Sequence, residues 1–327
     1  MARIGGKLLK KNVPLRHILE VDGRRLQLSN LEKVLYPEAG FTKGQVIDYY
    51  VRIARTILPY LKDRPITLKR YPNGVMAKHF YEKDKPRYTP PWVATFPVPR
   101  RAGGADIRYI MINDLPTLVW CANLANLELH PFLHRAPAID QPTAMVFDLD
   151  PGENADILDC GRVAFFLKDL FAQWKLALFP KVSGSRGIQV YVPLNTKVTY
   201  EVVRPLAKSI AEHLEREHPD LVIAEMAKVS RAGKVFIDWS QNSDFKTTVS
   251  VYSLRAKRPF PFVSMPVAWE ELDRALSKKD RRSLDFSPGA ALERIETLGD
   301  LFAPVLKLKQ RLPADLLKRF SIGNIVC

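Results

Sequence analysis

Two aspartates separated by one residue follow a run of apolar residues in the segment MVFDLDPG, residues 145–152. In a strand, side chains at i and i+2 share a face, so Asp148 and Asp150 point the same way and Leu149 points the other way. A Pro-Gly pair then ends the strand. Carboxylates this close repel each other unless a cation lies between them, and Mg²⁺ or Mn²⁺ prefers such oxygen ligands. The structural alternative is a helix-capping aspartate beside a second one paired with an arginine.

A glycine-flanked turn precedes a second expected strand in VSGSRGIQVYVP, residues 182–193. Small residues let backbone N–H groups point into a concavity, and Ser183, Ser185 and Arg186 add further donors. The segment predicts a phosphate-binding nest. A plain β-turn is the alternative, and the spacing of a Walker A loop is absent.

A third carboxylate, Asp238, ends the apolar strand of RAGKVFIDWSQN, residues 231–242. Two divalent metals about 4 Å apart need bridging ligands to hold attacking and leaving oxygens in line. A third aspartate opposite the first pair therefore favours a two-metal site for phosphoryl chemistry. The three motifs together are more specific than any one of them.

The charge of the chain indicates a polyanionic partner. Its 327 residues carry 50 Lys and Arg against 35 Asp and Glu, a net charge of +15, and basic residues recur beside aromatics as in KHFYEKDKPRY. This mixture suits both phosphates and stacked bases. We see no secretory signal and no apolar run of the roughly 20 residues that a membrane span needs. Three scattered cysteines argue against disulfides or zinc, so we expect a cytosolic protein.

The first part of the chain predicts one helix and two strands. Residues 41–61 carry apolar residues at helical spacing, and Thr42 with Gln45 could form a capping box. Residues 64–71 and 105–112 are expected strands. Prolines make residues 86–99 an expected surface loop, and a second proline-spaced stretch, residues 131–142, divides the chain.

The second part alternates strands and helices. We expect strands at residues 143–149, 188–194, 233–239 and 247–254, helices around 162–174 and 201–218, and two or three helices after Trp269. This order predicts an α/β (mixed α+β) fold of two packed lobes, the catalytic one a mixed sheet flanked by helices.

The chain resembles the primase-polymerase domain of bacterial DNA ligase D, in the archaeo-eukaryotic primase superfamily. The resemblance rests on LSNLEKVLYPEAGFTKG, RPITLKRYPNG, FYEK, LELH, VFDLDPG, SGSRG, AGKVFIDWSQN and YSLR, which follow the family's order and spacing over nearly the whole chain. It implies an N-terminal extension at residues 1–27, an N-terminal DNA-binding lobe at 28–140 and a catalytic lobe with C-terminal helices at 141–327.

The resemblance implies a template-dependent nucleotidyltransferase of end-joining repair. Such an enzyme adds NTPs, or less readily dNTPs, to a primer 3′-OH at gaps, overhangs or broken DNA ends that carry a 5′-phosphate. It implies two divalent ions, Mn²⁺ or Mg²⁺, as cofactors, the end-binding protein Ku and a DNA ligase as partners, and a place at the bacterial nucleoid.

By the same resemblance, Asp148, Asp150 and Asp238 match the family's catalytic metal ligands. Residues matching the nucleotide-binding positions are Lys69, His130, Ser183, Arg186, Gln189, Gln241, Arg231 and Arg255. Residues matching the 5′-phosphate and template positions are Asn30, Lys33, Lys43, Phe80 and Tyr81. Core packing is the alternative for Phe80, although flanking basic residues favour a nucleic-acid surface.

The sequence departs from the family at Gln189, where many members carry histidine. Glutamine can donate a hydrogen bond to a phosphate oxygen but cannot carry a charge. It shares a strand face with Tyr191 and Pro193, whereas the opposite face is wholly apolar. We therefore expect Gln189 to face the cleft. A solvated residue on a half-exposed strand is the alternative.

Two other functions share part of this pattern. A phosphatase of the haloacid dehalogenase type also opens on a strand ending in DxD, but it needs Thr or Val soon after the second aspartate, where this chain has Pro-Gly. A catalytically silent module that binds 5′-phosphorylated DNA ends is the other alternative, and the three aspartates argue against it.

Overall fold

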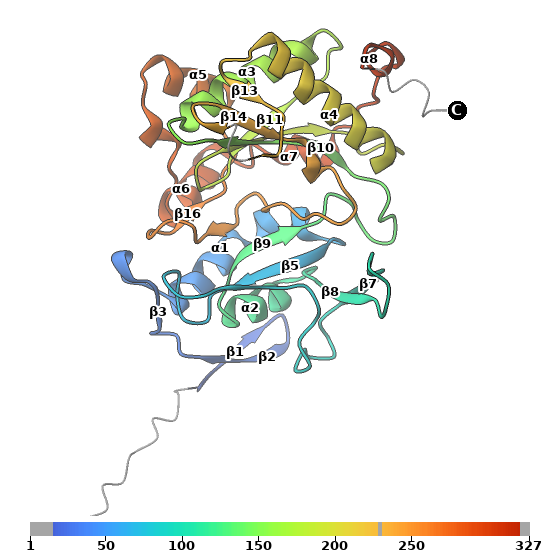
Figure 1. Cartoon of the computed structure of the whole chain (residues 1–327). Helices are drawn as coiled ribbons and strands as arrows, with labels where there is room; N and C mark the ends of the chain where they lie inside the picture. Colours follow the sequence, from blue (N-terminus) through green and yellow to red (C-terminus); the bar gives the residue numbers. More distant parts are fainter. Residues whose placement is uncertain (1–15, 228–230, 321–327) are drawn as a thin grey trace, which may run out of the picture.

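The computed structural model describes residues 16–227 and 231–320, which form two lobes stacked one on the other (Figure 1). These residues contain eight α-helices and several sheets, which confirms the expected mixed α/β fold. The expected N-terminal extension lies partly outside the described ranges, and from Arg16 onward it forms a β-hairpin. Within the same ranges, no helix is long and apolar enough to cross a membrane.

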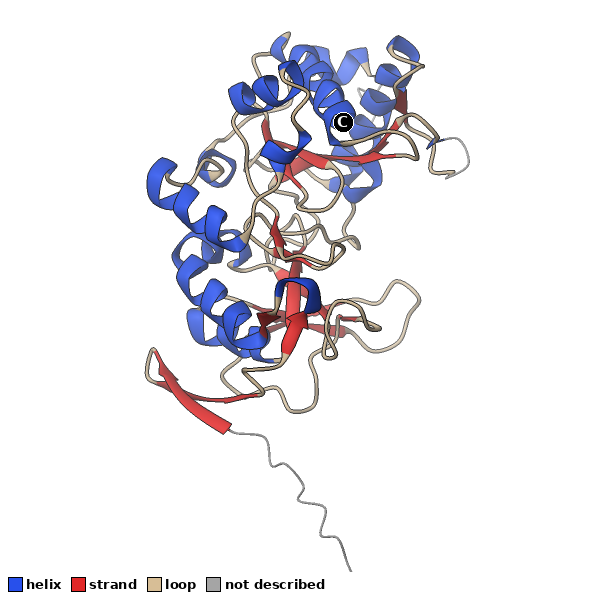
Figure 2. Ribbon diagram, turned by 90° about the vertical axis from the view of Figure 1, so that its left-hand side faces the viewer, coloured by secondary structure: helices blue, strands red, loops and turns tan. Residues whose placement is uncertain are grey.

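The N-terminal lobe is built around one sheet. In chain order its elements are β1 (Arg16–Val21), β2 (Arg24–Ser29), β3 (Val34–Tyr36), β4 (Phe41–Thr42), α1 (Lys43–Leu61), β5 (Pro65–Arg70), β6 (Phe80–Glu82), β7 (Thr95–Val98), β8 (Ile107–Met111), α2 (Leu115–Asn123) and β9 (Asn126–Pro131). Strand β5 pairs with β6, β8 and β9, and β7 pairs with β8. The helices of this lobe lie along one side of its strands (Figure 2).

Helix α1 begins where the sequence predicts it. The side chain of Thr42 accepts a hydrogen bond from the Gln45 N–H at 3.3 Å, and the Gln45 side chain accepts one from the Thr42 N–H at 2.8 Å. This reciprocal capping box satisfies two backbone donors that a helix start leaves unpaired. The apolar stripe of the helix is buried. The predicted helix and cap are confirmed.

The C-terminal lobe holds the other large sheet. Its elements are β10 (Ala144–Pro151), α3 (Ile157–Ala172), β11 (Phe179–Val182), β12 (Ile188–Pro193), α4 (Tyr200–Glu217), β13 (Val222–Ile223), β14 (Val235–Asp238), β15 (Leu254–Arg255), β16 (Phe262–Val263), α5 (Trp269–Ser277), α6 (Pro288–Leu298), α7 (Ala303–Lys307) and α8 (Ala314–Arg319). The strand order is β11-β12-β10-β14-β13. All pairs are antiparallel except β13 with β14.

Helices α3 and α4 cover one face of this sheet (Figure 1). Alternate residues of β10, such as Leu149, are fully buried, and Asp148 and Asp150 lie on the opposite face of the strand. That face is directed toward the N-terminal lobe. The sheet therefore delivers its carboxylates to the space between the lobes.

The two lobes share one hydrophobic core. Buried tyrosines of the N-terminal lobe reach the segment around β15, which lies between the lobes in Figure 1. The hydroxyl of Tyr36 donates to the Arg255 carbonyl at 2.9 Å, and that of Tyr49 donates to the Tyr252 carbonyl at 2.8 Å. Tyr50 donates to the Leu127 carbonyl at 2.7 Å and accepts from the Leu254 N–H at 3.2 Å.

Three expectations about secondary structure were wrong in part. Residues 86–99 are not wholly a loop, because β7 pairs with β8; an edge strand tolerates Pro97, whose missing N–H breaks no central ladder. Of residues 247–254, only Leu254 enters a strand, since the N–H groups of Thr248 and Ser250 bond instead to carbonyls of β9. Four helices, rather than two or three, follow residue 268 in the described chain.

Replacing Thr42 by alanine should lower the free energy of unfolding by about 1 kcal/mol, because the first turn of α1 loses its side-chain acceptor. Thr42→Ser, which keeps the hydroxyl, is the matched control. Urea denaturation of the two variants and the wild type measures the difference. Equal stability of the alanine and serine variants would show that the capping box does not stabilise the fold.

Candidate active site between the lobes

A cleft between the lobes collects most of the predicted site residues. It is lined by Lys69, Tyr81, Glu128, His130, Asp148, Asp150, Pro151, Ser183, Ser185, Arg186, Gln189, Gln241, Thr247, Thr248, Val249, Arg255, Lys257 and Arg258. Strands β5, β6 and β9 supply its wall in one lobe, and β10, β12 and the following loops supply the other. The cleft thus brings Asp148 and Asp150 into one space with basic side chains from both lobes.

Strand register sets the position of the carboxylates. Asp148 lies directly opposite Gln189 of β12 and Asp238 of β14, so these side chains form a row across the sheet. Burial, and then the charges of Asp150 and Asp238, raise the pKa of Asp148 to about 7. Burial also raises the pKa of Asp150. Two carboxylates that resist ionisation in this way would gain from a cation placed beside them.

The carboxylate of Asp238 is engaged locally. It accepts hydrogen bonds from the Ser240 N–H at 2.9 Å, from the Ser240 hydroxyl and from the Gln241 amide at 3.1 Å, and it lies 3.8 Å from Lys246 Nζ. In residues 16–227 and 231–320, no three His, Cys, Asp or Glu side chains form a group that could hold a metal. The oxygens of Asp148 and Asp150 suit a divalent ion, and the assignment of Asp238 as third ligand stays a prediction.

The serine-glycine turn has a well-defined conformation. The Ser183 hydroxyl oxygen accepts from the N–H groups of Ser185 at 3.2 Å and Gly187 at 3.3 Å. Gly184 has φ +68°, and a Cβ at Gly187 would lie 2.1 Å from the Leu149 carbonyl oxygen. The turn thus uses two of its own amides, as the β-turn alternative requires. Its donors toward the cleft are the serine hydroxyls and Arg186.

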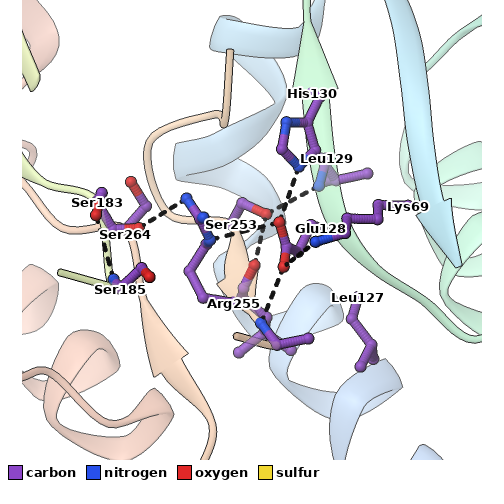
Figure 3. Close-up of polar contacts among 12 residues, drawn as sticks. Lys69, Leu127, Glu128, Leu129, His130, Ser183, Ser185, Ser253, Arg255 and Ser264 are labelled. Atoms are coloured by element: carbon purple, nitrogen blue, oxygen red, sulfur yellow. Dashed lines mark hydrogen bonds and ion pairs between the residues drawn. The ribbon is translucent and has the colours of Figure 1, made fainter. Parts of the chain in front are cut away.

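Three basic side chains of the cleft surround one carboxylate, Glu128 of β9 (Figure 3). It accepts from Lys69 Nζ at 3.3 Å and from His130 Nε2 at 2.9 Å, and it pairs with Arg255 Nε at 3.4 Å. Burial opposes ionisation of Glu128, but Arg255, His130 and Lys69 outweigh it and hold its pKa well below the usual range. Burial lowers the pKa of His130, which keeps the ring neutral at neutral pH.

Two other residues predicted to contact the nucleotide differ in position: Gln189 is buried in the cleft wall, and Arg231 lies outside the cleft lining. Gln189 is 2% exposed and donates to the Thr248 hydroxyl at 2.9 Å, so the solvated alternative is wrong. It does line the cleft, as expected. Arg231 lies outside the cleft lining, stacks over Phe236 with 3.6 Å to the ring centre and donates to the Met226 carbonyl.

The residues predicted to bind a 5′-phosphate lie together in the N-terminal lobe, outside this cleft. The Lys33 N–H donates to the Asn30 carbonyl at 3.0 Å, and the Lys43 N–H donates to the Lys33 carbonyl at 2.8 Å. Lys43 Nζ donates to the Ser29 carbonyl. Burial, and then Lys33, lower the pKa of Lys43 to about 8. Two ammonium groups whose charges act on each other would attract an anion, and binding of the 5′-phosphate here stays a prediction.

The predicted aromatic pair is on the surface. Phe80 is 41% exposed and Tyr81 is 55% exposed, both on β6, so core packing of Phe80 is excluded. Arg70 lies over the Phe80 ring and Lys69 over the Tyr81 ring, at 5.2 and 5.4 Å to the ring centres. Exposed rings beside cations provide a surface on which bases could stack.

Sequence reasoning missed several residues of the site. Glu128 stands in the motif LELH but received no role, and Lys257 and Arg258 line the cleft just after Arg255. Lys257 opposes the rise in the pKa of Asp150 by its charge. The signal for Glu128 was its spacing: two residues before His130, it shares a strand face with that histidine.

A cleft that combines paired carboxylates with basic side chains is typical of enzymes that handle phosphoanhydrides, and comparison with known proteins specifies the class as nucleotidyltransferase. Residues 42–302 match the family described as LigD, primase-polymerase domain, so the chain belongs to that family. Polymerases of this kind use divalent metal ions.

Similar proteins and a similar solved structure point to the same family. The chain is 40% identical over 283 residues, or 86% of its length, to the multifunctional non-homologous end joining protein LigD of Mycolicibacterium smegmatis. It is 32% identical over 255 residues, or 77% of its length, to the bifunctional LigD of Bacillus subtilis. It spans only 36% and 40% of these two proteins.

Among solved structures, the polymerase domain of Mycobacterium tuberculosis ligase D in complex with DNA matches with a TM-score of 0.80 and 39% identity. The match covers 88% of this chain and 99% of that one. The likeness therefore includes both lobes and the cleft between them.

Replacing Asp148 by asparagine should stabilise the fold at pH 8 when divalent ions are chelated. The pKa of Asp148 is about 7 in the fold against an ordinary 3.8, so the fold loses stability as pH rises from about 4 to 7. The variant lacks this penalty and should gain about 4 kcal/mol at pH 8, and only about 2 kcal/mol at pH 5. Urea denaturation at both pH values measures this, with Asp106→Asn at an exposed position as control. An equal difference at both pH values would contradict the raised pKa.

Proposed function

We propose that this chain is a template-dependent polymerase of bacterial end-joining repair. It adds NTPs in preference to dNTPs to a primer 3′-OH, at gaps and broken ends that carry a 5′-phosphate. The observation that carries the proposal is the cleft in which Asp148 and Asp150 face Lys69, His130 and Arg255. The DNA-bound ligase D domain with the same fold supports it.

Asp148 and Asp150, with Asp238 opposite, would hold two divalent ions, Mn²⁺ or Mg²⁺, which when bound supply Lewis acidity toward the attacking hydroxyl and the departing pyrophosphate. Lys69 and Arg255 would bind triphosphate oxygens from the opposite wall by charge-assisted hydrogen bonds. Arg186 and the serine hydroxyls of the turn would hold the same group from the side, and Gln189 and Gln241 would add neutral donors.

The N-terminal lobe would grip the DNA. Lys33 and Lys43, with Asn30 beside them, would bind the 5′-phosphate on the far side of a gap, and Phe80 and Tyr81 would stack on template bases. In this assignment residues 28–140 position the DNA and residues 141–327 carry the chemistry, on a fold of the archaeo-eukaryotic primase type.

The wider context is also proposed from the relatives, whose names describe non-homologous end joining. We propose that Ku and a DNA ligase act with this domain at broken ends in the nucleoid. A catalytically silent module that binds 5′-phosphorylated ends is the other candidate, and it is favoured only by the local engagement of Asp238.

Asp148→Ala and Asp150→Ala should each abolish nucleotide addition and leave DNA affinity within about twofold, because lysines and arginines, not the carboxylates, contact phosphates. Extension of a gapped duplex with Mn²⁺ and fluorescence anisotropy of the same DNA measure the two quantities. Asp106→Ala is the exposed control. If the wild-type protein binds the gapped DNA but never extends it, the silent binding module is the correct function.

Lys33→Ala and Lys43→Ala should weaken binding to gapped DNA with a 5′-phosphate by about tenfold or more, since each removes a charge-assisted contact. Binding to the same DNA with a 5′-hydroxyl should change little. Because the pKa of Lys43 is about 8, the preference for the phosphate should also fall between pH 7 and 9. Arg55→Ala on the exposed face of α1 is the control. Equal losses on both DNAs would make these lysines general backbone contacts.

A further inference from the structure

Glu128 is the most completely enclosed charged residue of the cleft wall. Its side chain is 0% exposed, and both oxygens have several partners. Oε1 accepts from Lys69 Nζ at 3.3 Å, the Tyr71 hydroxyl at 3.2 Å and the Ala256 N–H at 3.1 Å. Because no face of this carboxylate is open, it does not touch a nucleotide in the cleft.

The other oxygen completes the set. Oε2 accepts from His130 Nε2 at 2.9 Å and lies 3.4 Å from Arg255 Nε. Figure 3 shows Lys69, His130 and Arg255 arriving at this one carboxylate from different directions. They belong to β5, β9 and β15, so the neighbouring backbone alone does not bring all three together.

Within residues 16–227 and 231–320, the three basic groups share no carboxylate other than that of Glu128. Lys69 otherwise contacts the rings of Tyr71 and Tyr81, and Arg255 donates from its guanidinium to the Ser183 carbonyl at 2.9 Å. Lys69 is 2% exposed and Arg255 is 6% exposed, so bulk water solvates the charge of neither side chain. Without Glu128, buried cations would repel each other and would gain by turning toward solvent.

We propose that Glu128 is a positioning residue for nucleotide binding: it holds Lys69, His130 and Arg255 at fixed places so that they meet the incoming triphosphate as one preformed wall. This inference rests on the proposed polymerase function. A triphosphate carries charges at fixed spacings, and two cations and a neutral imidazole held in advance bind it without the cost of ordering three side chains. Glu128 therefore acts through its neighbours.

A positioning role of Glu128 can be distinguished from a purely structural role at the lobe junction. Glu128 also joins the lobes through the Ala256 N–H. Tyr50 joins them at the same junction, because its hydroxyl accepts from the Leu254 N–H. Among the described residues its hydroxyl bonds to Leu127, Ser253 and Leu254, and to none of the three basic groups. Tyr50→Phe therefore disturbs the junction and leaves the wall in place. It is the matched control.

The test compares Glu128→Gln, Glu128→Asp and Tyr50→Phe in the full chain, by steady-state extension kinetics, by calorimetric binding of ATP and by thermal unfolding. We expect Glu128→Gln to raise the nucleotide KM and the ATP Kd about tenfold, with kcat changed less than about threefold. Glu128→Asp keeps the charge and should show a smaller rise, which also serves if the glutamine variant does not fold. Tyr50→Phe should lower the unfolding temperature without changing KM.

An unchanged or lower KM and Kd in both Glu128 variants would overturn the proposal, since Glu128 would then only weaken the positive field of the wall. An equal rise in Tyr50→Phe would overturn it too, because the effect would belong to the lobe junction. Failure of the polymerase assignment gives a different result: wild-type protein that binds ATP but extends no primer. In that case the calorimetric Kd values still decide the role of Glu128.

Discussion

The register of β10 against its two neighbours is the constraint on which the site depends. A slip of one residue would move Asp148 and Asp150 to the helix-covered face and put Leu149 into the cleft. Close backbone contacts hold the register at the end of the strand. A Cβ at Gly152 would lie 1.8 Å from the Arg231 carbonyl oxygen, and one at Gly187 would meet the Leu149 carbonyl oxygen. These glycines therefore allow the turn motifs to lie directly against the strand that carries the aspartates.

The cleft separates charges that the fold could not bury together unpaired. On the sheet side, Lys246 and Lys257 offset only part of the repulsion between the aspartates, since the pKa of Asp148 is still raised to about 7, which fits a site that binds cations. On the opposite side, repulsion among basic groups is offset by Glu128 within the protein itself. The charges around Glu128 are thus balanced within the protein, whereas those of the aspartates would be balanced by bound cations. The triphosphate would lie between the two walls, since its oxygens can bind both metal ions and basic side chains.

The elements that carry the motifs could be predicted because their signals are local. The alternation in MVFDLDPG and the helical spacing after Thr42 appear in the sequence and survive in the fold. The role of Glu128 could not be predicted in this way, because it depends on Arg255, which is far along the chain. Nor could the hydrogen bonds of Asp238 to Ser240 and Gln241, since they depend on the turn after β14. Residues 247–254 alternate like a strand, but their partners are carbonyls of the other lobe.

The tyrosines at the lobe junction have a consequence for how the protein handles its substrates. Their hydroxyls tie the lobes by hydrogen bonds to Arg255, Tyr252 and Leu254, within a core that continues from one lobe to the other. Because this core is continuous across the junction in the described chain, we expect the lobes to unfold together and neither to be stable when expressed alone. Access to the cleft would then come from bending and fraying of the DNA, and a flexible gap or frayed end would be a better substrate than stiff duplex.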